Sequence, residues 1–207
     1  MAERYFTVDS ETEASNPGGL RVSRWRWLLR HPRWPMALGL VLVVVSSAAV
    51  KIHWGWWLPV MLVLLGNWYY WRRVYEHFAF GCLNPGQVVS VSPLKIAVLT
   101  DLSFGQGYYP ALKIVEVKSS GRWTVPIVIG ARVATIAVYS RSTEEDVRHW
   151  DDFDPHPVDP LVSDLDDARR LLERIPVEEF DQLGMALEGM SSLGIGLHRI
   201  EVESTDW

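Results

Sequence analysis

The sequence predicts an α+β protein on a membrane anchor: a two-helix transmembrane hairpin followed by a cytosolic antiparallel, partly barrelled β-sheet with two C-terminal helices. Three observations predict this class. Two long uncharged stretches lie near the N-terminus, short apolar runs broken by Gly and Pro fill the middle, and apolar residues recur every three or four positions near the C-terminus. The 207 residues leave room for an anchor and one ordinary domain.

The two uncharged stretches run from Trp34 to Val50 and from Trp54 to Trp71. As helices they span roughly 25 and 27 Å, close to the ~30 Å thickness of a hydrocarbon core. Tryptophan is concentrated around them: seven of the eleven Trp lie between positions 25 and 68. Because Trp prefers the headgroup level, this clustering favours a hairpin over residues 34–73 that crosses a membrane twice.

Basic residues predict the orientation of the hairpin. Arg72 and Arg73 follow the second stretch, whereas the connecting turn carries only Lys51. Since short cytoplasmic flanks collect Lys and Arg, we expect both termini to be cytoplasmic and the protein to lie in the cytoplasmic membrane. The same interpretation applies to five arginines before the first stretch: Arg21, Arg24, Arg26, Arg30 and Arg33.

Three other interpretations of the apolar stretches stay open. They are a cleaved signal peptide, a buried helical pair in a soluble protein, and one span with a re-entrant segment that Pro59 and Gly66 would interrupt. Asn67 is the strongly polar residue of the second stretch. It could pair helices in an oligomer, or be hydrated near the headgroups.

The segments before the hairpin differ from each other. Residues 1–20 are polar and aperiodic, which predicts a disordered tail. Residues 21–33 form a basic juxtamembrane segment in which arginines alternate with apolar residues at helical spacing. This segment could lie in the membrane interface and bind anionic lipids, or its arginines could simply fix the topology.

Residues 75–207 predict the cytosolic domain. Strands are expected at 86–92, 94–100 and 111–117, with one or two more within 125–139, and no helix separates them. Ser163 or Asp164 can cap a helix that ends at Pro176, and a second helix follows. A last strand is expected after Gly194 and Gly196, within LHRIEV.

The polar run His149 to Asp159 is the densest cluster of metal-type ligands in the sequence. Carboxylates and imidazoles at this density could bind a divalent cation, so a metal site is one hypothesis. Asp-Pro and His-Pro steps equally suit a structural turn, and a partner-binding surface is a third interpretation. The residues of the metal hypothesis are Asp151, Asp152, Asp154 and His156.

Other features exclude functions more than they suggest them. The acidic C-terminal part, with eighteen Asp or Glu against five Arg in residues 144–207, excludes nucleic-acid binding. Residues 103–110 contain Gly-x-Gly without a third Gly, which predicts a hairpin turn and not a nucleotide site. Cys82, the sole cysteine, lacks an evident base and is expected to be packed. No cofactor is expected.

Four segments support a resemblance that covers about residues 75–187. They are YEHFAFGCLNPGQVV, LKIAVLTDLSFGQGYYPALKIVEV, ARVATIAVYS and HWDDFDPHPVDP. Together they resemble a bacterial membrane-anchored family catalogued only as a domain of unknown function. The resemblance implies a bacterial source and a cytoplasmic-membrane location, and no activity.

The sequence therefore favours a membrane-tethered cytosolic interaction or scaffold domain without catalytic activity. Its expected partners are the lipid bilayer, with anionic lipids, and a protein partner or a second copy of the chain. The alternative function is a divalent-metal-dependent enzyme or sensor that uses the His149 to Asp159 cluster.

Overall fold

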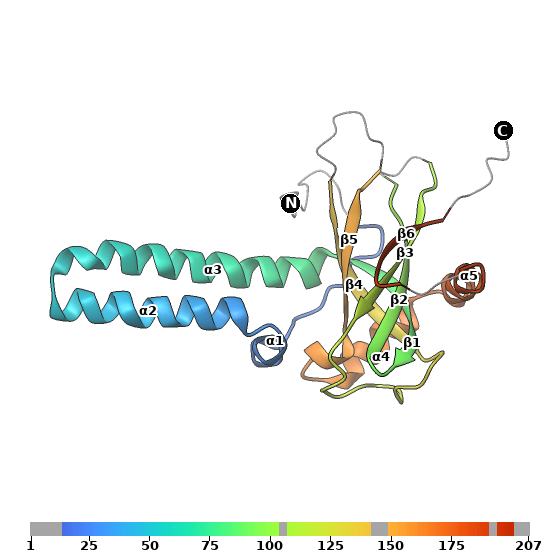
Figure 1. The fold of residues 1–207 in the computed structure, drawn as a ribbon, viewed down its shortest axis with the longest axis horizontal. Coiled ribbons are helices and arrows are strands. Elements are labelled where there is room, and N and C mark those ends of the chain that lie inside the picture. Colours follow the sequence, from blue (N-terminus) through green and yellow to red (C-terminus); the bar gives the residue numbers. More distant parts are fainter. Residues whose placement is uncertain (1–13, 104–106, 142–148, 191–193, 201–207) are drawn as a thin grey trace.

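The computed structural model describes residues 14–103, 107–141, 149–190 and 194–200. It holds a long helical hairpin and an α+β domain (Figure 1). In chain order the elements are α1 (Arg24–Arg30), α2 (Arg33–Lys51), η1 (Trp54–Trp56), α3 (Trp57–Phe80), β1 (Cys82–Val91), β2 (Leu94–Asp101), β3 (Pro110–Glu116), β4 (Arg132–Ser140), β5 (Asp152–Pro157), η2 (Asp159–Leu161), α4 (Leu165–Arg174), α5 (Val177–Glu188) and β6 (Gly196–Arg199).

The hairpin of α2 and α3 extends away from the domain, and η1 lies in the turn at its far end (Figure 1). The two helices pack on each other through a small contact of Val45, Ala49 and Val60. Within the described part of the chain, α2 is the one helix that is long and apolar enough to be a candidate span. A polar C-terminal half, with Asn67, Tyr, Arg and Glu, sets α3 apart from it.

The domain is built on a six-stranded antiparallel sheet in the order β5-β4-β1-β2-β3-β6, curled into a half-barrel (Figure 1). The expected α+β class with consecutive strands is confirmed. The apolar run 125–139 contains a single strand, β4, because the chain before it turns at Gly130 with a φ of 86°. A left-handed conformation of this kind suits Gly and interrupts an extended run.

The largest difference from the sequence expectation is β5, where the polar run around Asp154 forms an edge strand and not a turn. Val158 N–H donates to Ala134 O, so the even-numbered positions bond to β4. Pro155 and Pro157 therefore have their missing N–H groups on the outer edge, where no strand needs them. The alternation of buried and half-buried residues along β5 is the period-two signal of a strand.

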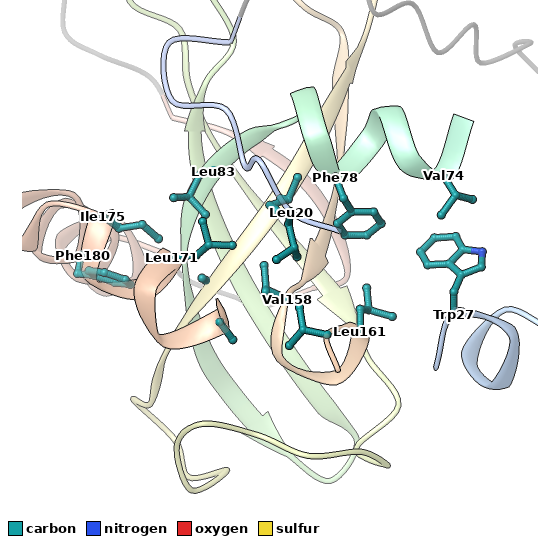
Figure 2. Packing of buried hydrophobic residues seen from close by; sticks show 14 residues of the cluster. Leu20, Trp27, Val74, Phe78, Leu83, Val158, Leu161, Leu171, Ile175 and Phe180 are labelled. Carbon is teal, nitrogen blue, oxygen red and sulfur yellow. The ribbon is translucent and has the colours of Figure 1, made fainter. Parts of the chain in front are cut away.

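Helices α4 and α5 cover one face of the sheet, as the sequence predicts. The Asp164 carboxylate accepts a hydrogen bond from Asp166 N–H at the start of α4, and α5 follows Pro176. Figure 2 shows Leu171, Ile175 and Phe180 of this layer beside Leu83 of β1. The same apolar cluster continues to Phe78, so the end of α3 belongs to the core of the domain.

The chain before α1 is packed against the domain. Gly18 N–H donates to Gly81 O at 2.9 Å, Leu20 N–H donates to Phe78 O at 3.1 Å, and the Leu20 side chain is buried. The segment 14–20 is thus part of the fold, contrary to the expectation of a disordered tail through residue 20. The rest of that expected tail, residues 1–13, lies outside the described residues.

Candidate functional site

A groove of about 870 Å³ lies where the half-barrel is open. Strand β5 forms one wall of the groove, and β3 with the start of β6 forms the other. The junction of α1 and α2 also lines the groove. Its lining segments are 30–34, 113–118, 154–157, 160–161 and 195–196.

A buried tryptophan holds α1 beside this groove. Trp27 Nε1–H donates to the Tyr70 hydroxyl at 2.7 Å, and its ring packs edge-on to Phe78 and His156, with centroids 5.7 and 5.5 Å apart. Figure 2 shows the Trp27 ring near Val74 and Phe78 of α3. Trp27 therefore fixes the position of the basic segment against both α3 and the sheet, although α1 has only two turns.

Two cations fasten α1 to the loop that follows β3. The Arg30 guanidinium donates to the Ser120 carbonyl, and Lys118 Nζ donates to the Arg30 carbonyl at 3.0 Å. The same loop is also bound to η2, because the buried Asp159 carboxylate accepts hydrogen bonds from the backbone N–H and the hydroxyl of Thr124. These hydrogen bonds hold α1 and the loop after β3 in place beside the groove.

Lys113 closes the inner end of the groove. Its ammonium donates to Asp152 Oδ1 at 2.7 Å and to the Phe153 carbonyl, so it links β3 to β5 across the gap in the sheet. The Lys113 side chain is buried, and its charge is balanced by that of Asp152. The other Arg and Lys side chains that line the groove are Arg30, Arg33 and Lys118, and the part of the groove that these three line is called its mouth below.

Three histidines pack together at the groove. His156 lies with its ring centroid 5.5 Å from that of His31 and 4.9 Å from that of His77. Burial, with the charge of His156, lowers the pKa of His77 to about 3. Burial also lowers the pKa of His31 to about 4, and the neighbouring charges of His156, Lys118 and Arg30 act in the same direction. Both rings are therefore neutral at physiological pH.

Asp154 supplies the opposite charge within this group. Its carboxylate lies 3.5 Å from His156 Nε2. Burial alone would raise the pKa of Asp154, but the hydrogen bond and charge of His156 hold it below its ordinary value. The carboxylate is therefore ionised and already has a partner.

The four residues of the metal hypothesis do not converge. Asp152 binds Lys113, Asp154 faces His156, and Asp151 lies 3.5 Å from Arg199. Asp152, Asp154 and His156 share one face of β5, where Asp154 and His156 contact each other but Asp152 is turned to Lys113. Across the described ranges, no group of three or more His, Cys, Asp or Glu could hold a metal ion. The metal hypothesis gains no support from this geometry.

The arginines of the basic segment divide into two groups. Arg30 and Arg33 line the groove. Arg24 lies over the Trp71 ring, 5.6 Å from its centroid, while Arg21 and Arg26 do not line the groove. Sequence reasoning missed Lys113 and Lys118, because an isolated Lys in a strand or loop carries no local signal of what it faces across the fold.

Cys82 lies in a second, smaller cavity of about 250 Å³. Burial raises the pKa of its thiol, as well as that of the neighbouring Tyr139 hydroxyl. Thr100 donates to Asn84 Oδ1 at 3.0 Å beside them. A protonated thiol in such surroundings is a poor nucleophile, in line with the packed cysteine that the sequence suggests.

The comparisons with known proteins give the family. A family model described as "Protein of unknown function (DUF3239)" matches residues 72–190. The chain belongs to this family. The match confirms the resemblance of residues 75–187 to a family of unknown function and covers the DUF3239 domain from Arg72, at the end of the hairpin, to Met190 after α5.

A solved structure is also similar to this DUF3239 protein. It is the crystal structure of a candidate membrane protein from Corynebacterium diphtheriae, with 19% identity and a TM-score of 0.49. The match covers 57% of this chain and 99% of that one. No curated protein is similar enough to the chain to count as a match.

Proposed function

We propose that this DUF3239 protein is a two-span membrane protein that holds a cytosolic binding domain against the inner surface of the cytoplasmic membrane. One observation carries the proposal: the helical hairpin extends from the domain with its apolar side chains exposed on both helices. Val43 is 64% exposed on α2, and Leu58 and Leu62 are 69% and 60% exposed on α3. A hydrocarbon phase is the environment in which such a surface is stable.

The second crossing rests on the pairing of α3 with α2. Helix α3 runs beside α2 in Figure 1 and packs on it near the turn, through Val60 against Val45 and Ala49. A helix beside a membrane span would lie in the same hydrocarbon layer, where the backbone must satisfy its own hydrogen bonds. Tyr69, Tyr70 and Trp71 would mark the place where α3 leaves the hydrocarbon, as Trp34 would mark it at the start of α2. The hydrophobic part of α3 would then be Trp57–Trp71, and the rest of α3 belongs to the domain.

Orientation follows from the charges beside the two helices. The turn at the far end of the hairpin carries Lys51. The five arginines at positions 21–33, the last of which begins α2, lie on the side of the domain, as do Arg72 and Arg73 after the span. Positive flanks stay in the cytoplasm. The domain would therefore face the cytoplasm and lie directly at the membrane surface.

Binding, and not catalysis, suits the chemistry of the domain. The groove offers a formed, cationic cavity, whereas the Cys82 thiol is held protonated and the histidines at the groove are packed among themselves. A scaffold or interaction role needs only such a surface. In such a role, the ligand that binds in the groove would determine the function of the domain.

Membrane fractionation tests this proposal. The full chain should stay in the membrane pellet after extraction with alkaline carbonate and enter solution only with detergent. Carbonate removes proteins that are held by charge alone, so it separates an inserted hairpin from a basic segment that adheres to lipid. Recovery of the intact chain in the carbonate supernatant would overturn the proposal.

A further inference from the structure

We propose that the groove at the open side of the half-barrel binds the phosphate headgroup of an anionic phospholipid, with Arg30, Arg33 and Lys118 as its cationic ligands. The proposal rests on the membrane anchorage proposed above, since the lipid must reach the groove from the adjacent leaflet. It goes beyond that anchorage by naming a site, its residues and the class of its ligand.

Position is the first argument. The groove is lined by Arg33 and Trp34, which are the first two residues of α2. If α2 crosses the bilayer, its first turn lies at the level of the headgroups, and Trp34, 70% exposed, marks that level. A phospholipid beside α2 could therefore place its headgroup in the groove without leaving its leaflet.

Charge is the second argument. Three cations from three segments line the groove: Arg30 from α1, Arg33 from α2 and Lys118 from the loop after β3. Two acidic residues also line the groove, Glu116 and Asp154, and Asp154 is paired with His156. The balance at the mouth favours an anion.

The donors at the mouth suit phosphate. Arg30 contacts Ser120 and Lys118 contacts the Arg30 carbonyl, yet a guanidinium has five N–H donors and an ammonium three. Each therefore has donors beyond these contacts. A planar guanidinium matches phosphate oxygens in a bidentate manner, while an ammonium binds them as a compact charge.

Size and lining are the third argument. At about 870 Å³ the groove is within the usual range of small-molecule sites, roughly 300–1,000 Å³, and much larger than phosphate alone needs. Apolar side chains, among them Trp34, Leu161 and Ile195, line it beside the charged ones. An amphiphile with a phosphate and a glycerol backbone uses both kinds of surface, whereas a free phosphate ion uses only the first.

The test compares two pairs of substitutions that remove the same charge. Arg33→Gln with Lys118→Gln changes the groove, and the amide introduced by Lys118→Gln could still donate to the Arg30 carbonyl. Arg21→Gln with Arg26→Gln changes the same basic region outside the groove. Arg30 is left intact because it fastens α1 to the loop.

Binding is measured on the full chain in neutral detergent micelles. Phosphatidylglycerol, phosphatidylcholine or glycerol 3-phosphate is titrated in, and native mass spectrometry counts the bound molecules. The wild type should retain phosphatidylglycerol in preference to phosphatidylcholine. The groove pair should weaken phosphatidylglycerol binding about thirty-fold, as two cations at ~1 kcal/mol each imply. The control pair should change it less than about twofold.

Three outcomes would overturn the site. Equal loss in both pairs would mean diffuse attraction to the basic segment, and no loss in the groove pair would mean that the groove is not used. Glycerol 3-phosphate binding as tightly as the lipid would assign the groove to a soluble anion. Carbonate extraction of the same variants separates this failure from failure of the anchorage, because a groove variant that loses lipid should still stay in the membrane pellet.

Discussion

The hairpin and the domain of this chain differ in where they place apolar side chains. In the domain, Phe78, Ile96 and Ile136 are fully buried, whereas the hairpin buries little beyond the contact of Val45, Ala49 and Val60. The domain satisfies its apolar residues internally, and the hairpin leaves them on its surface. One chain is thus built for two surroundings, and α3 passes from one to the other.

Two arginines introduced into the hairpin should have the largest effect, which is the loss of membrane association. Val43→Arg with Leu62→Arg places a charge within the apolar part of each helix, at a cost of about 2.5–3.5 kcal/mol per residue in a membrane. The full chain should move from the carbonate-resistant pellet to the supernatant or be degraded. Ile129→Arg, on the exposed surface of the domain, is the control and should leave the pellet unchanged.

Helix α3 allows the two surroundings to be compared within one element. Phe78→Ala removes a fully buried ring and should lower the free energy of unfolding of the domain by about 3–5 kcal/mol. Trp68→Ala removes a ring that is 58% exposed and should change it by less than about 0.5 kcal/mol. Urea unfolding of the domain in micelles, followed by near-UV circular dichroism, measures both. Similar losses would mean that Trp68 is also part of the domain core.

Two glycines, Gly66 within α3 and Gly81 directly after it, also differ in their surroundings. A Cβ at Gly81 would lie 2.2 Å from the His77 carbonyl oxygen and 2.8 Å from the Ala137 carbonyl oxygen, and neither backbone atom can move freely. Gly81→Ala should therefore destabilise the domain by about 1–3 kcal/mol in the same urea assay. Gly66→Ala in the hairpin meets nothing within 4 Å and should be neutral or slightly stabilising. Equal effects of the two substitutions would contradict the close backbone contacts around Gly81.

Two buried histidines should make the stability of the domain depend on pH, His77 near the end of α3 and His31 after α1. Because burial lowers the pKa of His77 to about 3, unfolding lets this ring take up a proton once the pH falls below its ordinary value near 6.5. The contribution of His77 should thus be full above pH 6.5 and fall toward pH 3, by at most about 1.4 kcal/mol per pH unit. His31, whose pKa burial lowers to about 4, should add a loss in the same direction. The lowered pKa of Asp154 acts in the same direction, but only below about pH 4.

A substitution isolates this contribution. His77→Gln should make the dependence of the urea midpoint on pH between 6 and 4 shallower, whatever its effect on stability at neutral pH, and the slope that remains should come from His31. His53→Gln, in the exposed turn of the hairpin, should leave the slope as it is in the wild type. An unchanged slope in the His77 variant would mean that His77 is protonated in the folded domain.

Local sequence patterns predicted the elements but not the groove. The apolar runs indicated the strands β1 to β4 and the helices α4 and α5, since period and capping are local properties. The edge strand β5 was missed because Pro155 and Pro157 lack the N–H donors that a strand with two neighbours needs, so they favour a turn. At the edge of a sheet this loss is tolerated, but the sequence does not show which strand lies at the edge. The cations at the groove come from three separate segments, and their convergence depends on how the half-barrel curls, which no local pattern encodes.

Cysteine labelling can test whether the chain crosses the membrane twice and keeps its domain inside. Single cysteines test it most directly, because Cys82→Ser gives a background without a thiol. Ile52→Cys lies in the hairpin turn and Ser119→Cys on the domain, both at exposed positions. With a membrane-impermeant maleimide, the first should be labelled on intact cells and the second only after lysis. Labelling of Ser119→Cys on intact cells, or protection of Ile52→Cys until lysis, would contradict the account.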